Sequence, residues 1–166
     1  MAYGYPPSTL TKTSHALTIK VNGEAIGLIN GWNPTQSRTV TGIYEIGTDN
    51  SGNPVEYMPG NATGLTISIS RYDMYTKRME EAFGTKDLVM LTRQSEPFDV
   101  HEVWKTVDGK DERFIYTGCW FTSLGRTIRS DDNRIINVNA TLVYTKKIKA
   151  TGIVGGVASF SLPTIA

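Results

Sequence analysis

Residues 64–84 read GLTISISRYDMYTKRMEEAFG, a stretch whose apolar period changes half-way along. In the first half, LTISIS, apolar residues alternate with Thr or Ser, which predicts a strand with one buried face and one wet face. From Asp73 onward the apolar residues fall at helical spacing, with Ser70 or Asp73 as a candidate N-cap and Gly84 as a candidate C-cap. We therefore predict a strand that runs directly into a helix of about three turns, the only convincing helix in the chain.

The bulk composition fits one globular domain. A chain of 166 residues can bury roughly 70% of its unfolded surface in a single core without a metal or a disulfide. Its 17 basic and 16 acidic side chains nearly cancel, which excludes the electrostatic signature of a dedicated DNA, RNA or anionic-membrane binder. Any contact with nucleic acid is therefore expected to be weak or transient.

The single cysteine and the chain start favour a protein made in a cytoplasm. Cys119 lies in the apolar run GCWF, so we expect a small buried side chain and not a nucleophile. No basic region followed by an apolar core opens the chain, and no apolar run of about 18 residues occurs. We expect no signal peptide, no membrane contact, and synthesis and assembly in a cytoplasm.

The first third of the chain predicts an arm and two hairpins. Residues 1–15 are rich in Pro, Ser, Thr and Gly without an apolar face, which is typical of an N-terminal arm. Alternation resumes in LTIKV, and the Asn22-Gly23 pair that follows is a strong signal for a tight hairpin turn. A second strand pair, residues 39–46 and 55–58, is joined by GTDNSGNP, whose composition predicts an exposed, projecting loop.

The remainder of the chain is predicted to be almost entirely strand. LVMLTR, residues 88–93, is predicted as a strand, and the block from residue 97 to 147 as three or four strands separated by DGKD, SLGRT and SDDN turns. The predicted fold is mainly β, a sandwich or barrel with one flanking α-helix and extended terminal arms. We assign residues 16–150 to this domain and residues 151–166 to a C-terminal arm.

No catalytic centre, metal site or cofactor site is predicted. His15 and His101 lie far apart and outside any metal-spaced cluster. Asp131 and Asp132 lack the ligand pattern of a calcium loop and are interpreted as a charged turn. No dinucleotide fingerprint or phosphate-binding loop is present. An enzymatic function is therefore not expected.

Five aromatic residues gather in one part of the sequence. Two readings fit them, a base-stacking platform and alternation through a core, and the core reading is the commoner origin of such a pattern. The five are Trp104, Phe114, Tyr116, Trp120 and Phe121.

The order of these features resembles that of bacteriophage tail tube proteins. The resemblance covers roughly residues 15–146 and depends most on SRYDMY at the strand-to-helix junction, on EPFDV, and on the block from GCWFTS to NVNATLVY. It implies a β-sandwich subunit that closes into hexameric rings, whose inner sheets merge into a β-barrel. Rings of this family stack into a tube that guides the genome from capsid to host. The type VI secretion tube protein is similar in fold.

The resemblance also implies partners. Double-stranded DNA would pass transiently through the tube, and the expected protein partners are further copies of the chain, a tape-measure protein, a baseplate, a tail-terminator protein and, in contractile tails, a sheath. Ring symmetry repeats each bore side chain once per copy, so one lysine would become a cationic ring that retards DNA. We therefore expect small uncharged residues in the bore: Thr66, Ser68, Ser70, Asn137, Asn139 and Thr141.

Contacts between rings are expected from the projecting loop and both chain ends, residues 2–13 and 152–166. These segments are too loosely composed to order alone, and such segments commonly order on a partner. The expected contact residues are Thr48, Asp49, Asn50, Ser51, Gly52, Asn53 and Pro54 in the loop, and Ile153, Val154, Phe160, Leu162 and Ile165 near the C-terminus. Two alternatives stay open: a type VI secretion-like tube, or a sandwich-type binding module with exposed Trp32 or Trp104 as its ligand platform.

Overall fold

The structure is a computed structural model that describes residues 12, 16–27, 29–47, 51–85, 88–105, 110–130 and 135–153. Within these residues there are ten strands and two short helices, and none of the helices could span a membrane. The strands are β1 (Leu17–Val21), β2 (Glu24–Ala25), β3 (Ile29–Thr35), β4 (Arg38–Ile43), β5 (Glu56–Ala62), β6 (Thr66–Tyr72), β7 (Phe98–Lys105), β8 (Lys110–Thr127), β9 (Asn137–Val143) and β10 (Lys146–Ile153). The helices are α1 (Met79–Ala82) and the 3₁₀-helix η2 (Leu91–Arg93).

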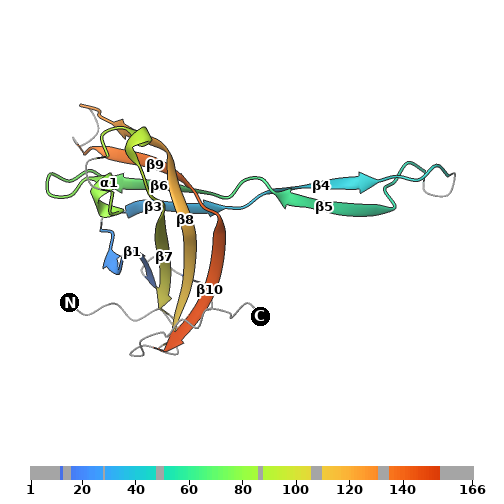
Figure 1. Ribbon diagram of the computed structural model, residues 1–166, viewed down its shortest axis with the longest axis horizontal. Helices are drawn as coiled ribbons and strands as arrows, with labels where there is room; N and C mark the ends of the chain where they lie inside the picture. Colours follow the sequence, from blue (N-terminus) through green and yellow to red (C-terminus); the bar gives the residue numbers. More distant parts are fainter. Residues whose placement is uncertain are drawn as a thin grey trace.

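Eight strands form one antiparallel sheet that folds over on itself (Figure 1). The 18-residue strand β8 is the shared element: its first part pairs with β7 and β10, and its second part pairs with β9. We call β2, β1, β7, the first part of β8 and β10 half-sheet A. The second part of β8 with β9, β6 and β3 is half-sheet B. In Figure 1 the strands of the two halves cross one another, which gives the predicted sandwich.

The bend of β8 occurs at Gly118, and this overturns one predicted turn. Gly118 has a φ of +65°, a conformation that L side chains rarely adopt, and its backbone N–H donates to Asp99. The predicted SLGRT turn is wrong, because Ser123 and Thr127 continue the ladder opposite Thr141 and Asn137 of β9. Gly125 is an interior strand residue, and the glycine that redirects the chain lies seven positions earlier in the sequence.

The core lies between the half-sheets. Ile67 and Ile69 of β6 are buried, as their alternation predicts, and the wet face of the same strand is Thr and Ser. Three phenylalanine rings pack with centroids 5.3–5.5 Å apart at one end of the core: Phe83, Phe98 and Phe121. The other buried apolar side chains of this cluster are Ile19, Val21, Ile26, Met79, Ala82, Leu88, Val100, Tyr116, Cys119, Val138, Ala140, Leu142 and Tyr144. Of the five aromatic residues singled out from the sequence, Tyr116 and Phe121 are core, whereas Trp120 is exposed.

The predicted three-turn helix is wrong: α1 has four residues and begins after Arg78. The reason is Arg71, which is 2% exposed and whose guanidinium donates to the backbone carbonyls of Gly27 (2.9 Å) and Lys77 (3.0 Å). A buried guanidinium needs acceptors, and a loop that wraps around it leaves the Lys77 carbonyl outside a helical hydrogen bond. Residues 73–78 therefore form the loop that the helical pattern concealed.

At α1 the predicted C-terminal glycine is confirmed, and both predicted N-caps are wrong. Neither Ser70 nor Asp73 is the N-cap; Arg78 is, and its N–H donates to the Glu81 carboxylate (3.3 Å). Gly84 follows the helix with a φ of +81°, and its N–H donates to the Glu81 carbonyl, so the predicted C-terminal glycine is confirmed.

The predicted strand LVMLTR is also wrong, because this segment turns into η2. Its backbone bonds are local, from Arg93 to Met90 and from Gln94 to Leu91. The Gln94 side chain makes two hydrogen bonds to the backbone of β8, as a neighbouring strand would. Its amide nitrogen donates to the Cys119 carbonyl, and its amide oxygen accepts from Phe121 N–H. A side-chain amide thus satisfies backbone groups of β8 next to its bend.

Both predicted hairpins are confirmed. Asn22 and Gly23 have positive φ values of 52° and 83° and connect β1 to β2. β4 and β5 pair only with each other within the described residues and project far from the sandwich (Figure 1). We call residues 38–62 the arm. It continues β3 and β6 directly, and backbone bonds between Ser37 and Gly64 close its base.

Strand β10 continues past the predicted end of the domain. It pairs with β8 from Lys146 opposite Thr117 to Ile153 opposite Lys110. Regular pairing therefore enters the segment, residues 151–166, that the sequence assigned to a C-terminal arm.

Gly118→Ala is expected to lower the free energy of unfolding of the subunit by about 1–3 kcal/mol. The added Cβ would require a left-handed alanine and would lie 2.6 Å from Thr145 Oγ1. Gly125→Ala in the same strand is the matched control, because its nearest neighbour would be Asn139 O at 4.0 Å. Urea denaturation of both variants measures the difference, and equal stabilities would contradict the role given to Gly118.

Candidate functional site

The most distinctive surface is the outward face of half-sheet B. The register places Ser68 opposite Thr141 and Ser70 opposite Asn139, while Ile67 and Ile69 between them point into the core. All six residues that the sequence assigned to the bore share this face, and none of them is buried. The structure thus brings two distant segments, residues 66–70 and 137–141, into one wall.

The structure widens this surface by two strands. Asn33 and Thr35 of β3 lie opposite Ser68 and Thr66, and Ser123 and Thr127 of β8 lie opposite Thr141 and Asn137. We call the whole surface the polar face, and the register places on it Gly31, Asn33, Thr35, Thr66, Ser68, Ser70, Tyr72, Trp120, Ser123, Gly125, Thr127, Asn137, Asn139, Thr141 and Val143. None of these residues is charged.

Sequence reasoning missed the β3 and β8 contributions for identifiable reasons. Asn33 and Thr35 alternate with Trp32 and Pro34, a usable signal that the proline obscured. Ser123 lay inside a segment interpreted as a turn. Short hydroxyl contacts link neighbouring strands of the face, such as 2.7 Å between the Thr35 and Thr66 oxygens.

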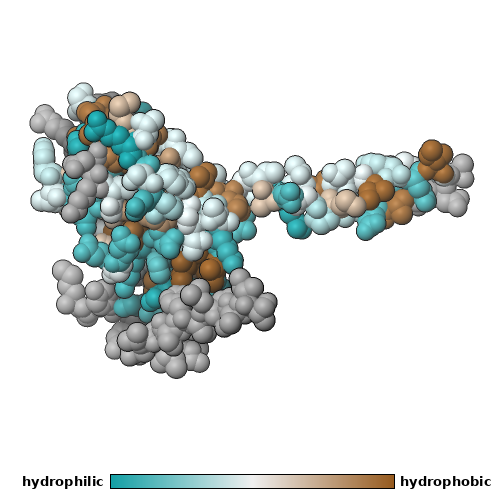
Figure 2. Space-filling view, in the orientation of Figure 1, coloured by the Kyte–Doolittle hydropathy of each residue, from teal (hydrophilic) through white to brown (hydrophobic). Residues whose placement is uncertain are grey.

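The arm is the second distinctive surface, since every residue of β5 is exposed. Figure 2 shows apolar patches along it, well away from the sandwich. Among the predicted contact residues, Ser51, Gly52, Asn53 and Pro54 lie at its end, with positive φ at Ser51 and Gly52. The other predicted contact residues in the loop, Thr48, Asp49 and Asn50, lie outside the described residues. The exposed large apolar side chains between residues 38 and 62 are Val40, Ile43, Tyr44, Ile46, Val55, Tyr57 and Met58.

The C-terminal predictions are mostly untested. Ile153 is the last residue of β10, and its backbone pairs with Lys110. Val154, Phe160, Leu162 and Ile165 lie outside the described residues.

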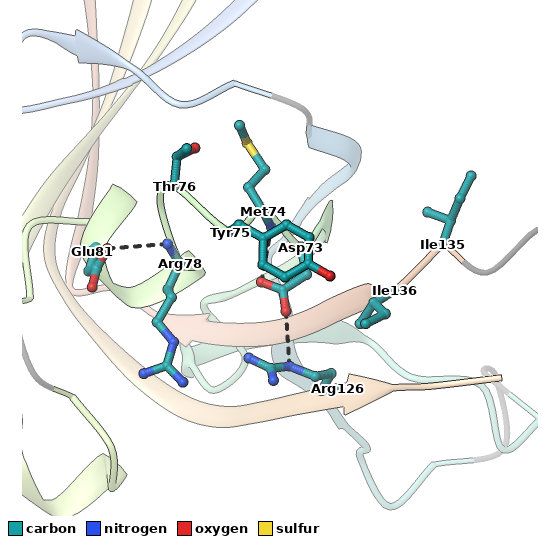
Figure 3. Close-up of a pocket in the computed structure, with 9 residues that line it drawn as sticks. All are labelled: Asp73, Met74, Tyr75, Thr76, Arg78, Glu81, Arg126, Ile135 and Ile136. Carbon is teal, nitrogen blue, oxygen red and sulfur yellow. Dashed lines mark hydrogen bonds and ion pairs between the residues drawn. The ribbon is translucent and has the colours of Figure 1, made fainter. Parts of the chain in front are cut away.

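A cleft of about 630 Å³ lies where the loop after β6 meets the end of β8 (Figure 3). Arg126 Nε of β8 lies 3.1 Å from the Asp73 carboxylate, which ties the two segments together. Glu81 accepts from Arg78 N–H, as described above, so the acidic groups of this cleft are engaged with basic residues or backbone. The arrangement is that of a structural junction.

The two side chains most capable of chemistry, Cys119 and His101, are buried or half-buried, and burial shifts the pKa of each toward its neutral form. Burial, with a smaller contribution from Asp99, raises the pKa of the Cys119 thiol to about 12, so the thiol stays protonated. Burial and the nearby Arg113 lower the pKa of the half-buried His101. No group of three or more His, Cys, Asp and Glu that could hold a metal ion occurs in the described part of the chain. His15, Asp131 and Asp132 lie outside it.

The two tryptophans of the binding-module alternative do not form an exposed platform. Trp32 and Trp104 are half-buried, and both indole N–H groups donate to Glu102, at 3.0 and 2.6 Å. Their polar edges are therefore already used inside the subunit, and this part of the alternative is wrong.

Comparison with known proteins identifies the family. The family model of the Phi812 tail tube protein matches residues 8–148. The chain belongs to this tail tube family. Tail tube proteins are structural components of the virion, and this confirms the resemblance seen in the sequence. A comparison with curated proteins found no match.

Solved structures share the fold of this tail tube protein at low sequence identity. The sheath-tube complex of the extracellular contractile injection system PVC has a TM-score of 0.64 and 17% identity, and the match covers 87% of this chain and 95% of that one. The tube-terminating cap of the anti-feeding prophage has a TM-score of 0.65 and 16% identity, covering 87% and 93%. The SPP1 tail tube has a TM-score of 0.60 and 10% identity, covering 85% and 80%.

Proposed function

We propose that this chain forms hexameric rings that stack into a tail tube, with the polar face lining a bore through which double-stranded DNA passes into the host. The observation that carries the proposal is the polar face itself, a four-strand wall whose own residues carry no charge; Arg129, just beyond β8, lines a hollow at its end together with Ser70 and Asn137. Mobile DNA presents one negative charge per 1.7 Å of helix axis, and fixed cations along its path would hold it by replacing counterions. A neutral, hydrogen-bonding wall stays wet and lets the duplex slide.

The topology of half-sheet B supports closure into a ring. Its strands alternate in direction, so β3 of one copy would meet the second part of β8 of the next copy in antiparallel orientation. With four strands from each of six copies, typical strand spacing and tilt give a barrel about 48 Å across between opposite backbones. Apart from Tyr72 and Trp120, the polar face carries no large side chain, which leaves such a bore wide enough for a hydrated double helix.

The arm supports stacking along the tube axis. A two-stranded ribbon alone is marginally stable in water, and this one exposes Val40, Tyr57 and Met58. The arm continues the direction of β3 and β6 (Figure 1), so in a ring it would extend along the bore wall. A second copy in the neighbouring ring would cover these side chains. The contacts would be made by the arm end and the terminal segments named above.

Further partners follow from the family and belong to this proposal. A tape-measure protein would occupy the bore before the genome, and a baseplate and a tail terminator would close the ends. A contractile sheath would surround the tube if the tail is contractile. Assembly would take place in the host cytoplasm.

Replacing residues 48–54 by a two-residue Asn-Gly turn is expected to abolish long tubes. The shortened arm loses the contacts between rings, whereas the sandwich keeps its core because the arm pairs only with itself among the described strands. Negative-stain electron microscopy measures tube length, and thermal melting of the subunit is the control and should not change. Full-length tubes from this variant would count against the role of the arm, and a wild-type chain that stays monomeric at high concentration would refute the proposed function.

A further inference from the structure

Glu102 of β7 is a carboxylate that the fold buries, with 6% of the residue exposed. Its Oε1 accepts a hydrogen bond from Trp104 Nε1 at 2.6 Å. Its Oε2 accepts two, from Trp32 Nε1 at 3.0 Å and from the Tyr116 hydroxyl at 2.7 Å. Charge-assisted hydrogen bonds of this kind are among the stronger ones in a protein interior.

The three donors differ in where they come from. Trp104 is on β7 and Tyr116 on β8, so both belong to half-sheet A together with Glu102. Trp32 is on β3, the outermost strand of half-sheet B. Only the Trp32 bond therefore links the two halves of the sandwich through this carboxylate.

The described residues show how β3 meets half-sheet A at this point. A cleft of about 640 Å³ lies between β1 and β3, and its lining includes Leu17, Ile29, Trp32 and Glu102. Beyond Trp32, the Tyr144 hydroxyl donates to the Thr35 carbonyl at 3.2 Å. The Tyr144 ring packs edge-on against Tyr116 at 5.0 Å, and Trp32 packs against Tyr116 at 6.0 Å. One connected network thus fixes β3 at two places along its length.

The three groups that donate to Glu102 keep their protons, so the hydrogen bonds to it are permanent. Burial, and then the neighbouring Glu102 carboxylate, raise the pKa of the Tyr116 phenol, which therefore remains a neutral donor. Indole N–H groups do not titrate and have no other hydrogen-bonding role than to donate. The carboxylate thus faces three donors that remain donors.

The position of β3 matters twice in the assembly. Among the described strands β3 pairs with β6 alone, so its other edge is the one that would meet a neighbouring copy in the ring. It also continues through Gln36 and Ser37 into β4, so its direction sets the direction of the arm. An error in β3 would therefore affect ring closure and stacking together.

We propose that Glu102 is a positioning residue for assembly, acting through Trp32 to fix strand β3 as the ring-closing edge and as the root of the arm. This inference rests on the proposed function, because it concerns how the subunit is prepared for rings and tubes. It assigns an assembly role to a side chain that is buried inside the subunit.

A matched pair of substitutions tests it, Trp32→Phe and Trp104→Phe. Each removes one indole donor from the same carboxylate, keeps an aromatic ring and leaves Glu102 with two donors. Their main difference is the strand that loses its link; in addition, the Trp32 ring packs against Tyr116, and the Trp104 ring lies under the Lys12 ammonium at 5.0 Å. Hydrogen exchange of the β3 amides in the unassembled subunit is the first readout, tube yield by sedimentation and electron microscopy is the second, and the melting temperature corrects for general loss of stability.

Trp32→Phe is expected to speed exchange at β3 about tenfold, with β9 unchanged, and to reduce tube yield strongly. Trp104→Phe is expected to leave β3 exchange within about twofold of wild type and to form tubes. Equal effects of the two variants on β3 exchange, or normal tubes from Trp32→Phe, would overturn the proposal. A wild-type chain that forms no tubes would refute the proposed function instead, and the exchange readout would still test Glu102.

Discussion

Arg71→Ala is expected to lower the free energy of unfolding of the subunit by about 3–5 kcal/mol. The guanidinium is almost fully buried, and it satisfies carbonyls in two separate loops, at Gly27 and Lys77. Burial lowers the pKa of the guanidinium, and the nearby Asp73 and Glu80 partly offset this; arginine remains protonated in proteins, so the buried group is a cation. Removal leaves a cavity and takes the donor from two part-buried backbone carbonyls, which adds a desolvation penalty to the lost packing.

Arg126→Ala is the matched control for this prediction. Arg126 also lies beside Asp73, at 3.1 Å, but its side chain is 41% exposed. An ion pair with one solvent-exposed partner contributes on the order of 1 kcal/mol, so this variant should stay much closer to wild type than Arg71→Ala in urea denaturation. Arg71→Ala within about 1 kcal/mol of Arg126→Ala would show that the loop does not depend on the buried guanidinium.

Ser68→Lys is expected to reduce the infectivity of assembled virions by about tenfold or more. Ser68 is exposed near the middle of the polar face, opposite Asn33 on one side and Thr141 on the other. In a hexameric ring the substitution places six ammonium groups at one level of the bore, and stacking repeats them at every level. These ammonium groups would replace the counterions of the DNA phosphates and so hold the DNA in the bore. DNA ejection would therefore slow.

Two further substitutions at the same position separate charge from size. Ser68→Gln adds a similar bulk without charge and is expected to eject DNA nearly normally. Ser68→Glu repels phosphate and should not retain DNA either. The readout is the rate of DNA release from purified virions at several salt concentrations, because the Lys effect should weaken as salt rises. Similar slowing by Lys and Gln would mean that space, and not charge, governs passage.

The parts of the fold that depend on local alternation could be predicted from the sequence. The buried positions Ile67 and Ile69 and the Asn22-Gly23 turn are determined by neighbours close in the chain. The same period of two placed the six bore candidates together on the outward face of β6 and β9, although their place in an assembled bore stays a prediction.

The parts that could not be predicted depend on contacts between distant residues. The pattern after Asp73 is genuinely helical, and only the carbonyl of Gly27, brought in from the β2–β3 connection, reveals why Arg71 keeps that segment in a loop. Gly118 and Gly125 look alike in the sequence, and only the φ of Gly118 and its contact with Thr145 distinguish the bend. These are tertiary effects that override local propensity.

The most direct test of the whole account is a helical cryo-EM reconstruction of the assembled tube at side-chain resolution. We expect Ser68, Asn139 and Thr141 to face the bore, β3 of one copy to pair with β8 of the next, and each arm to contact the neighbouring ring. A reconstruction with the polar face buried between copies, or on the outside of the tube, would contradict it.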